Sequence, residues 1–332
     1  MNIVYSSSDS YAPIAGVSLY SLLKNNTQCR ELNVFIIENN ISERNKEKFT
    51  RLCADFSRPL YFIPIADIEK LAGTSIDIGR WNISTFGRLF EASLLPEWVE
   101  KVIHIDCDTM IMSSLEPLWE KDMTGKIVAG ALECIGDSYK TEIGLTPKDT
   151  YINAGNIMLN LKKIREDGTE ELFKKYIAEH SQLSFVDQAV LNACVKSEEK
   201  LVVPLDYNAY SMVFYVKYKN LKRVKRVSSY YSEDEVANAV KNPCVVHFTT
   251  CFMDGTRPWM ENNFHPMLAQ YLDFKKNSPW ADEPLWKDER SGLKKAAYKM
   301  FRVLPEGFVT GAIGFVHGGI IPMKNRLKNK QR

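Results

Sequence analysis

The chain has 332 residues, of which 45% are apolar and 25% charged, and this ordinary globular composition excludes disorder over most of its length. The formal net charge of +2 argues against nucleic-acid binding by the chain as a whole. Its seven cysteines are scattered and form no CxxC pair. They therefore argue against a cysteine-based zinc site, and they favour free thiols in a reducing compartment over a disulfide framework.

The N-terminal segment is predicted to form a strand and then a helix. Residues 3–5 are apolar and predict a short buried strand, and the small polar residues 6–10 are typical of a strand-to-helix turn. Pro13 suits the first turn of a helix, and apolar residues follow it at roughly helical spacing. The first residues contain neither the basic nor the apolar part of a secretory signal, so we expect a cytoplasmic protein.

Strands and helices alternate over much of the chain. We expect Ser42 to cap the second helix and the strand before Asp106 to end there. The alternation predicts an α/β fold with a Rossmann-like, mostly parallel sheet flanked by helices. Ligands bind beyond the carboxyl ends of such strands, so we expect residues 6–10 and 106–108 at one rim. The expected strands cover residues 3–5, 32–37, 60–65, 101–105, 127–132, 157–161, 201–205 and 245–248, and further helices cover about residues 85–95 and 187–195.

Asp106-Cys107-Asp108 is the sharpest local signal. Two carboxylates, one residue apart, leave the end of an apolar strand, and carboxylates are hard oxygen ligands suited to Mg²⁺ or Mn²⁺. Such a cation commonly bridges protein carboxylates and the phosphates of a substrate. The alternative is an acidic loop that is merely solvated, and the strand-like residues before Asp106 favour the metal site.

His247 follows another apolar strand and is a candidate third metal ligand, because a neutral imidazole can bind a cation. A hydrogen-bonded histidine in the core or at its rim is the alternative. The loop after it contains Gly255 and Arg257, followed by Pro258 and Trp259. Glycine allows close backbone approach and the arginine fork suits a phosphate, so the combination indicates an anion-binding loop.

Three other places suit a sugar substrate. Asn153 precedes an apolar strand, and its amide can both donate to and accept from sugar hydroxyls, although Asn and Gly also favour simple turns. Asp187 and Gln188 open a predicted helix, where Asp can also serve only as a cap. Arg88 lies within a predicted helix, with a surface or structural ion-pair role as the alternative.

These segments together resemble glycosyltransferase family 8, the retaining GT-A enzymes that include lipooligosaccharide galactosyltransferases and glycogenin. The resemblance covers roughly residues 1–270, and no single segment is decisive, but all occur in the expected order. The segments are Ile-Val-Tyr-Ser-Ser-Ser-Asp-Ser-Tyr (3–11), Phe-Gly-Arg-Leu (86–89), Ile-Asp-Cys-Asp-Thr (105–109), Asn-Ala-Gly (153–155), Asp-Gln (187–188) and His247 followed by Gly-Thr-Arg-Pro-Trp (255–259).

The resemblance implies a role for each segment. It implies that Mn²⁺, or Mg²⁺, is bound by Asp106, Asp108 and His247. It implies catalytic contacts to the donor sugar from Arg88, Asn153, Asp187 and Gln188. It implies that the UDP-sugar, UDP-glucose or UDP-galactose, is bound by Ser6, Ser8, Asp9, Tyr11, Asp106, Cys107, Gly255 and Arg257, with Tyr11 stacking on uracil.

Two features depart from the family pattern. Family members often carry an acidic residue where this chain has Ser8. The closing loop usually reads His-x-x-Gly-x-x-Lys-Pro-Trp, whereas here seven residues separate His247 from Gly255, and Arg257 replaces the lysine. Arginine can still neutralise a diphosphate, with a different geometry. We expect residues 249–254 to shape the acceptor side of the site.

The implied reaction is transfer of a hexose with retention of configuration. UDP leaves with negative charge, which the cation and Arg257 would stabilise while the anomeric carbon becomes oxocarbenium-like. Gln188 is expected near the reacting face, but an amide is a poor nucleophile. Front-face attack by an oligosaccharide or lipid-linked acceptor is therefore favoured over a stable covalent intermediate.

The C-terminal residues 271–332 are predicted to form a basic and apolar extension beyond a catalytic domain of residues 1–270. From residue 290 onward Glu306 is the only acidic residue, and the apolar residues 307–323 are too few to span a bilayer. An interfacial segment on anionic lipid at the inner face of the membrane is one interpretation. Packing on its own domain or on a sister subunit is the other. The basic residues are Arg290, Lys294, Lys295, Lys299, Arg302, Lys324, Arg326, Lys328, Lys330 and Arg332.

The sequence bears on two other function classes. A nucleotidyltransferase would show a Gly-rich, basic loop near the N-terminus, and residues 6–10 contain neither glycine nor lysine. A non-catalytic module that binds a UDP-sugar or glycan is the main alternative, because the closing loop is altered. Metal-dependent activity would discriminate it from an enzyme.

Overall fold

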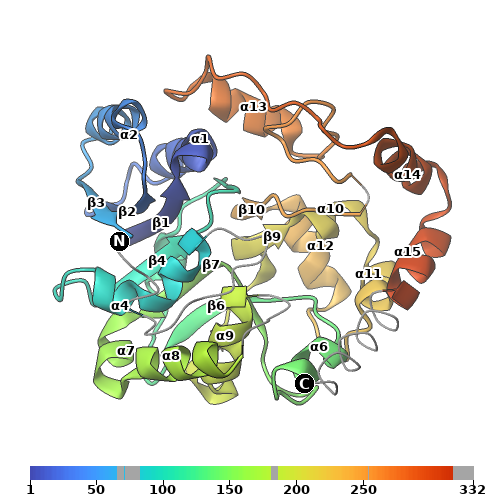
Figure 1. The fold of residues 1–332 in the computed structure, drawn as a ribbon, viewed down its shortest axis with the longest axis horizontal. Helices are drawn as coiled ribbons and strands as arrows, with labels where there is room; N and C mark the ends of the chain where they lie inside the picture. The colour runs from blue at the N-terminus through green and yellow to red at the C-terminus, as the bar shows by residue number, and fades with distance from the viewer. Residues whose placement is uncertain (66–70, 72–82, 181–185, 253, 317–332) are drawn as a thin grey trace.

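The computed structural model describes residues 1–65, 71, 83–180, 186–252 and 254–316. A twisted sheet crosses the middle of the molecule, with helices on both of its faces (Figure 1). The basic residues from Lys324 onward, which belong to the predicted C-terminal extension, lie outside the described residues.

The described residues form a main sheet of seven strands in the order β3-β2-β1-β4-β7-β6-β8. β7 runs antiparallel to both neighbours, and all other neighbouring strands are parallel, so the predicted mostly parallel α/β sheet is confirmed. The strands are β1 Asn2–Ser8, β2 Asn33–Asn39, β3 Leu60–Pro64, β4 Lys101–Ile105, β6 Val128–Leu132, β7 Ile152–Asn160 and β8 Lys200–Val202.

Three strands differ most from the prediction. β1 extends to Ser8, so only η1 (Asp9–Tyr11) forms the turn before the first helix. β7 begins at Ile152, five residues earlier than predicted. Its first residues extend beyond the end of β4 and are held in the sheet by pairing with β6. The strand predicted over residues 201–205 ends at Val202, since Pro204 has no N–H to donate and a 3-10 helix follows.

A second sheet of three strands lies beside the main one, in the order β5-β10-β9. β5 (Thr109–Ile111) directly follows Asp108, and it pairs antiparallel with β10 (Val245–His247), which pairs in parallel with β9 (Ala209–Tyr210). The strand predicted over residues 245–248 therefore belongs to this small sheet rather than to the main alternation. Its two short partners were not predicted.

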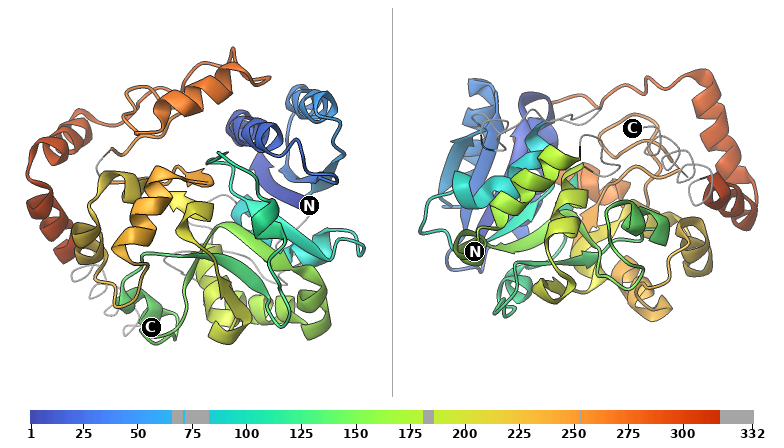
Figure 2. Two further views of the ribbon diagram at one scale, coloured as in Figure 1. Left: turned by 180° about the vertical axis from the view of Figure 1, so that it is seen from behind. Right: turned by 60° about the horizontal axis from the view of Figure 1, so that its bottom comes forward.

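The helices cover both faces of the main sheet (Figures 1 and 2). Their bounds near the N-terminal half are α1 Ala12–Asn25, α2 Glu43–Asp55, η2 Ile83–Phe90, α4 Glu91–Leu94, α5 Glu116–Trp119, α6 Asp137–Glu142, α7 Leu161–Asp167 and α8 Thr169–Glu179. Those that follow are α9 Val186–Cys194, η3 Ser197–Glu199, η4 Leu205–Asn208, α10 Ser211–Tyr215, α11 Tyr218–Lys225 and α12 Glu233–Lys241. The stretch predicted as one helix over residues 85–95 is mostly the 3-10 helix η2.

Alternating side chains of the strands face two apolar layers. Ile3 and Tyr5 of β1 pack in the layer that contains α1 and α2. Val4 packs in the opposite layer, with Phe86 of η2 and Phe173 of α8. Burial on both faces explains why these strands read as continuous apolar runs in the sequence.

The cap of α2 differs from the prediction. Ser42 occupies the N-cap position, but its side chain makes no capping hydrogen bond. Instead, the carboxylate of Asp9 accepts 2.8 Å hydrogen bonds from the backbone N–H of Ser42 and from Nδ2 of Asn45. These hydrogen bonds lower the pKa of Asp9. A carboxylate from the turn after β1 therefore caps a helix whose N-cap residue lies 33 positions later in the chain.

The C-terminal segment passes over the domain as three helices joined by irregular chain (Figure 1). α13 (Leu268–Lys276) continues across residues 270 and 271, and Trp280 is completely buried against Gly16 of α1. α14 (Gly292–Val303) has no buried side chain, and α15 (Glu306–Phe315) packs on α11. Within the described residues, every helix is too short or too polar to cross a bilayer. Division of the chain at residue 270 stays a prediction.

Candidate active site and metal centre

The candidate site lies where the carboxyl end of β4 meets the second sheet. β4 ends at Ile105, so Asp106 is the first residue beyond the main sheet, and β5 begins directly after Asp108. His247 is the last residue of β10 and pairs with Thr109. This pairing brings Asp106, Asp108 and His247 together, and one ligand atom of each lies within 4.8 Å of the others.

Gly155 allows this close approach. Its carbonyl oxygen accepts a 2.8 Å hydrogen bond from the N–H of Asp106, which joins β7 to the end of β4. A Cβ atom at Gly155 would lie 2.1 Å from Cε1 of His247 and 2.9 Å from Oδ2 of Asp106. The site can therefore hold the imidazole at this position only because residue 155 has no side chain.

The charged groups of the cluster lie close enough to shift one another's pKa. Oδ1 of Asp108 lies 3.2 Å from Nε2 of His247, and its Oδ2 lies 2.9 Å from Nη1 of Arg257. Burial opposes ionisation of Asp108, but His247 and Arg257 outweigh it and lower its pKa to about 2. Burial raises the pKa of Asp106, although Arg88 and His247 oppose it.

His247 responds to the same carboxylates. Burial alone would lower its pKa, but Asp108 and then Asp106 raise it above the usual range. The space between the two carboxylates therefore favours positive charge. A proton on His247 or a divalent cation can supply that charge.

The chemistry of this donor set fits a divalent metal ion. Carboxylate oxygens are the ligands preferred by Mg²⁺ and Mn²⁺, and an imidazole nitrogen favours a transition metal. Asp106, Asp108 and His247 would hold the ion, and three protein ligands leave positions for substrate oxygens. The identity of the metal stays a prediction.

Arg88 is buried beside this cluster, in η2. Its Nη2 lies 2.5 Å from Oδ1 of Asp106 and its Nε lies 2.8 Å from Oδ2 of Asp187, and the guanidinium also donates to the carbonyl of Ala154. Burial raises the pKa of Asp187 to about 6. The sequence predicts a contact of Arg88 to the donor sugar, with a surface or structural ion-pair role as the alternative. The structure shows a buried ion-pair residue, and the sugar contact stays a prediction. Arg88 holds one oxygen of Asp106 and leaves the other facing His247.

Asn153 and Gln188 lie beside the cluster and bond to other parts of the protein. Oε1 of Gln188 accepts a 2.9 Å hydrogen bond from the N–H of Ala154. Oδ1 of Asn153 accepts from the N–H of Gly155 at 2.8 Å and from Nδ2 of Asn208 at 2.7 Å. Their expected contacts to the donor sugar stay predictions.

The segment expected to bind the nucleotide lies at the same rim. Ser6 and Ser8 are at the carboxyl end of β1, and the thiol of Cys107 donates to the carbonyl of Ser6 at 3.2 Å. Burial raises the pKa of Cys107 to about 12, so it is a thiol at neutral pH. Tyr11 is half-buried and meets Trp286 edge-on, with ring centroids 5.6 Å apart. The carboxylate of Asp9 accepts hydrogen bonds from the start of α2, and its contact to the nucleotide stays a prediction.

The loop after β10 reaches back to the cluster. Gly255 has φ +68°, and a Cβ atom there would lie 2.2 Å from Cζ of Tyr298 in α14. Nη1 of Arg257 lies 2.9 Å from Oδ2 of Asp108, and its guanidinium lies 5.4 Å from the ring centroid of Trp259. The loop therefore connects a C-terminal helix with a carboxylate of the candidate metal centre.

Sequence reasoning missed two residues of this site. Asn208 is fully buried at the end of η4, and its Oδ1 lies 3.0 Å from Nδ1 of His247. The carboxylate of Glu133 accepts a hydrogen bond from Nδ2 of Asn153. Neither belongs to a motif, and Asn208 comes near His247 only because β9 pairs with β10.

Comparison with known proteins gives a consistent result. A family model described as glycosyl transferase family 8 matches residues 2–263. A putative glycosyltransferase of Haemophilus influenzae is 31% identical over 212 residues, which is 61% of this chain and 61% of that relative. Lipopolysaccharide 1,2-glucosyltransferase of Escherichia coli is 23% identical, over 95% of this chain and 89% of its own.

A solved structure of the galactosyltransferase LgtC, in complex with donor and acceptor sugar analogues, superposes with a TM-score of 0.67 at 19% identity. The superposition covers 90% of this chain and all of that one. At this identity the likeness bears on the fold, and it confirms the GT-A fold that the sequence predicts.

Proposed function

The chain belongs to glycosyltransferase family 8, and from this premise we propose that it transfers glucose or galactose from a UDP-sugar to a glycan or lipid-linked acceptor. Transfer proceeds with retention of configuration, in synthesis of cell-surface polysaccharide or lipooligosaccharide. The convergence of Asp106, Asp108 and His247 within 4.8 Å carries the proposal. A diphosphate leaving group needs positive charge held at such a point.

The names of two similar proteins support the choice of sugar. The Escherichia coli relative is a glucosyltransferase that acts on lipopolysaccharide, and LgtC is a galactosyltransferase. Glucose and galactose differ at one hydroxyl, so a panel of donors is needed to choose between them.

Positive charge at the site stabilises UDP as it leaves. A bound cation, Mn²⁺ in this proposal, supplies electrostatic stabilisation of the leaving phosphate. Asp106, Asp108 and His247 hold the cation, with Arg88 fixing one oxygen of Asp106. Arg257, 2.9 Å from Asp108, exchanges that carboxylate for a phosphate oxygen when the donor binds.

The environment of Gln188 favours front-face attack. Its amide is a poor nucleophile, and its Oε1 already accepts the N–H of Ala154. The anomeric carbon becomes oxocarbenium-like as the bond to phosphate breaks. The acceptor hydroxyl then attacks from the side of the departing phosphate, which takes up the proton.

The C-terminal helices support attachment to an anionic membrane surface. α14 carries Lys294 and Lys299 together with the apolar side chains of Leu293 and Val303, which are 87% and 79% exposed. Phe308 at the start of α15 is 67% exposed. Exposed apolar groups among cations suit the interface of an anionic bilayer, and this would bring the enzyme to a lipid-linked acceptor.

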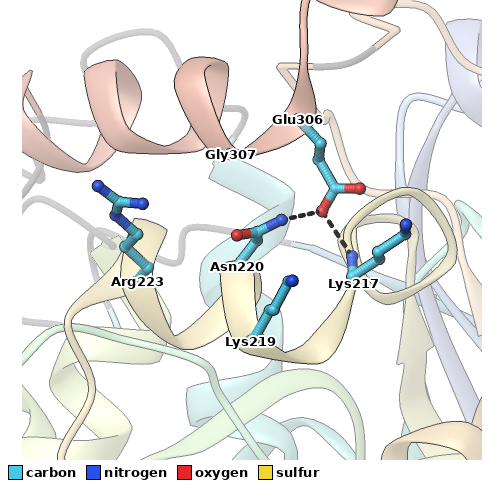
Figure 3. Close-up of a pocket in the computed structure, with 6 residues that line it drawn as sticks. All are labelled: Lys217, Lys219, Asn220, Arg223, Glu306 and Gly307. Carbon is cyan, nitrogen blue, oxygen red and sulfur yellow. Dashed lines mark hydrogen bonds between the residues drawn. The ribbon is translucent and has the colours of Figure 1, made fainter.

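A basic cavity of about 500 Å³ lies between α11 and α15 on the same part of the molecule (Figure 3). Its lining contains one carboxylate, that of Glu306, and three cationic side chains. Oε1 of Glu306 accepts hydrogen bonds from the backbone N–H of Lys217 and from Nδ2 of Asn220. The excess of cations suits the phosphate of a lipid headgroup. Its lining residues are Lys217, Lys219, Asn220, Arg223, Glu306 and Gly307.

One observation favours the second candidate, a non-catalytic module that binds a UDP-sugar. Arg257 forms an ion pair with Asp108, a carboxylate that catalysis needs for the cation. A binding module would keep this pair after the nucleotide is bound. An enzyme would exchange it.

The test is release of UDP from a panel of UDP-sugars, with and without Mn²⁺, by wild type and by Asp108→Ala. We expect Mn²⁺-dependent release from one hexose donor, lost in the variant. Asp122→Ala is a matched control, because Asp122 lies in an exposed turn with Thr124, and it should keep full activity. UDP binding without release from any donor, even with acceptors present, would favour the binding module.

A further inference from the structure

A chain of hydrogen bonds joins the backbone of β7 to His247. The N–H of Gly155 donates to Oδ1 of Asn153, and Nδ2 of Asn208 donates to the same oxygen. Oδ1 of Asn208 lies 3.0 Å from Nδ1 of His247. The side chains of Asn153, Asn208 and His247 are buried, at 6%, 0% and 5% exposure, so their polar atoms need hydrogen-bond partners within the protein.

The direction of every bond follows from the first one. A backbone N–H can only donate, so the atom of Asn153 that it contacts must be the carbonyl oxygen. That oxygen can only accept, so Asn208 must turn its amino group toward Asn153. The carbonyl oxygen of Asn208 is then left for His247, and Nδ1 of His247 must carry a proton to donate to it.

Glu133 requires the same orientation of the Asn153 amide. Its carboxylate accepts a hydrogen bond from Nδ2 of Asn153. An ionised carboxylate can only accept a hydrogen bond. If the Asn153 amide were flipped, its oxygen would face the carboxylate of Glu133 and its amino group would face the N–H of Gly155, and neither pair could form a hydrogen bond. The orientation of Asn153 is therefore determined twice.

We infer that Asn208 is a positioning residue that fixes His247 with its proton on Nδ1 and directs Nε2 toward the two carboxylates. Nε2 lies 3.2 Å from Oδ1 of Asp108 and 3.6 Å from Oδ2 of Asp106. A hydrogen bond to the outer nitrogen orients a metal-binding imidazole and raises its basicity. Asn153 anchors this arrangement in addition to any contact it makes with the sugar.

The inference rests on the proposed function, because it assumes that His247 binds a cation. The first measurement is therefore Mn²⁺ affinity in the presence of UDP, followed by loss of the free-ion signal in electron paramagnetic resonance. Asn208→Leu removes both hydrogen bonds and should weaken binding about 10- to 100-fold. Asn208→Asp keeps an acceptor for Nδ1–H but loses the donor to Asn153, so it should recover only part of the affinity.

Asn156→Ala is the matched control for loss of a buried asparagine. Asn156 lies in β7 and donates to the carbonyl of Tyr207, without touching His247. It should lose stability with little change in Mn²⁺ affinity. Equal affinities for wild type and Asn208→Leu would overturn the inference while leaving the proposed function intact.

The tautomer gives a second readout that does not depend on activity. In protein labelled with ¹⁵N-histidine, with UDP and diamagnetic Mg²⁺, the proton of His247 should be on Nδ1 and protected from exchange. Asn208→Leu should lose this protection, and His247→Gln identifies the signal. A proton on Nε2 would overturn the inference. If wild type binds no Mn²⁺, the proposed function fails, and the Nδ1 proton still tests the role of Asn208.

Discussion

The cationic side chains differ in their surroundings between the rim at the end of β4 and the C-terminal helix α14. At the rim, Arg88 and Arg257 are each paired with a carboxylate at 2.9 Å or less. On α14, Lys294 and Lys299 are exposed, and no side chain of the helix is buried. Paired, buried charges fix a geometry, whereas exposed cations stay available to a partner surface. The difference separates a region suited to chemistry from one suited to docking.

The same substitution in the two regions gives the largest expected contrast. Gly155→Ala places a Cβ atom 2.1 Å from the His247 ring, while Gly292→Ala at the start of α14 meets nothing within 4 Å. We expect Gly155→Ala to lower kcat/KM by about 100-fold or more, because the ring must move from its position. Gly292→Ala should leave it unchanged. Comparable rates for the two variants would contradict the packed geometry of the rim.

Arg257 tests the electrostatic part of the rim. Arg257→Ala should lower kcat by about 100-fold, because one charge that faces the leaving phosphate is lost. Arg257→Lys should lose less, since a lysine keeps the charge without the planar fork. Arg44→Ala, which removes an exposed surface ion pair with Glu283, serves as the control. Steady-state UDP release measures all three, and equal kcat for Arg257→Ala and wild type would remove Arg257 from the mechanism.

The cations of α14 test the docking region. Each lysine near an anionic surface contributes about 1 kcal/mol, so Lys294→Ala with Lys299→Ala should weaken binding to phosphatidylserine vesicles by about 30-fold. UDP release in solution should not change. The control pair, Lys174→Ala with Lys175→Ala, lies on α8. Equal vesicle binding by both double variants would show that α14 does not contact the membrane.

The stability of the fold, rather than activity or docking, tests His265, which packs between the rings of Phe214, Tyr215 and Phe248. Burial lowers its pKa to about 4, from 6.5 in the unfolded chain. Between pH 6.5 and 4 the unfolded chain binds more protons, so stability falls as pH falls through this window, by roughly 3 kcal/mol. Urea unfolding of wild type and His265→Gln measures it. The same pH slope in both would exclude His265 as the cause.

Much of the main sheet could be predicted because burial on both faces leaves long apolar runs in the sequence. Asp106 and Asp108 could also be placed, since a strand end followed by two carboxylates is a local pattern. The capping of α2 by Asp9 could not be predicted, because it depends on where α2 begins in space relative to β1. Residues 153–155 were placed before a strand, with a simple turn as one alternative, although pairing with neighbouring strands makes them part of β7.

The residues that hydrogen-bond to the site residues were the least predictable part of the site. Asn208 and Glu133 carry no motif, and their partners lie 39 and 20 positions away in the chain. Both contacts follow from strand pairing, which the sequence pattern does not specify. The ion pairs of Arg88 were visible only as one of two alternatives, for the same reason.

The most direct test of the central claim is a crystal structure of the protein with Mn²⁺ and UDP, with anomalous data collected for manganese. We predict one anomalous peak bound by a carboxylate oxygen of Asp106, one of Asp108 and Nε2 of His247, with the diphosphate completing its coordination and Arg257 turned from Asp108 to phosphate. A peak elsewhere, or UDP bound with Arg257 still paired to Asp108 and no manganese at the cluster, would contradict the account.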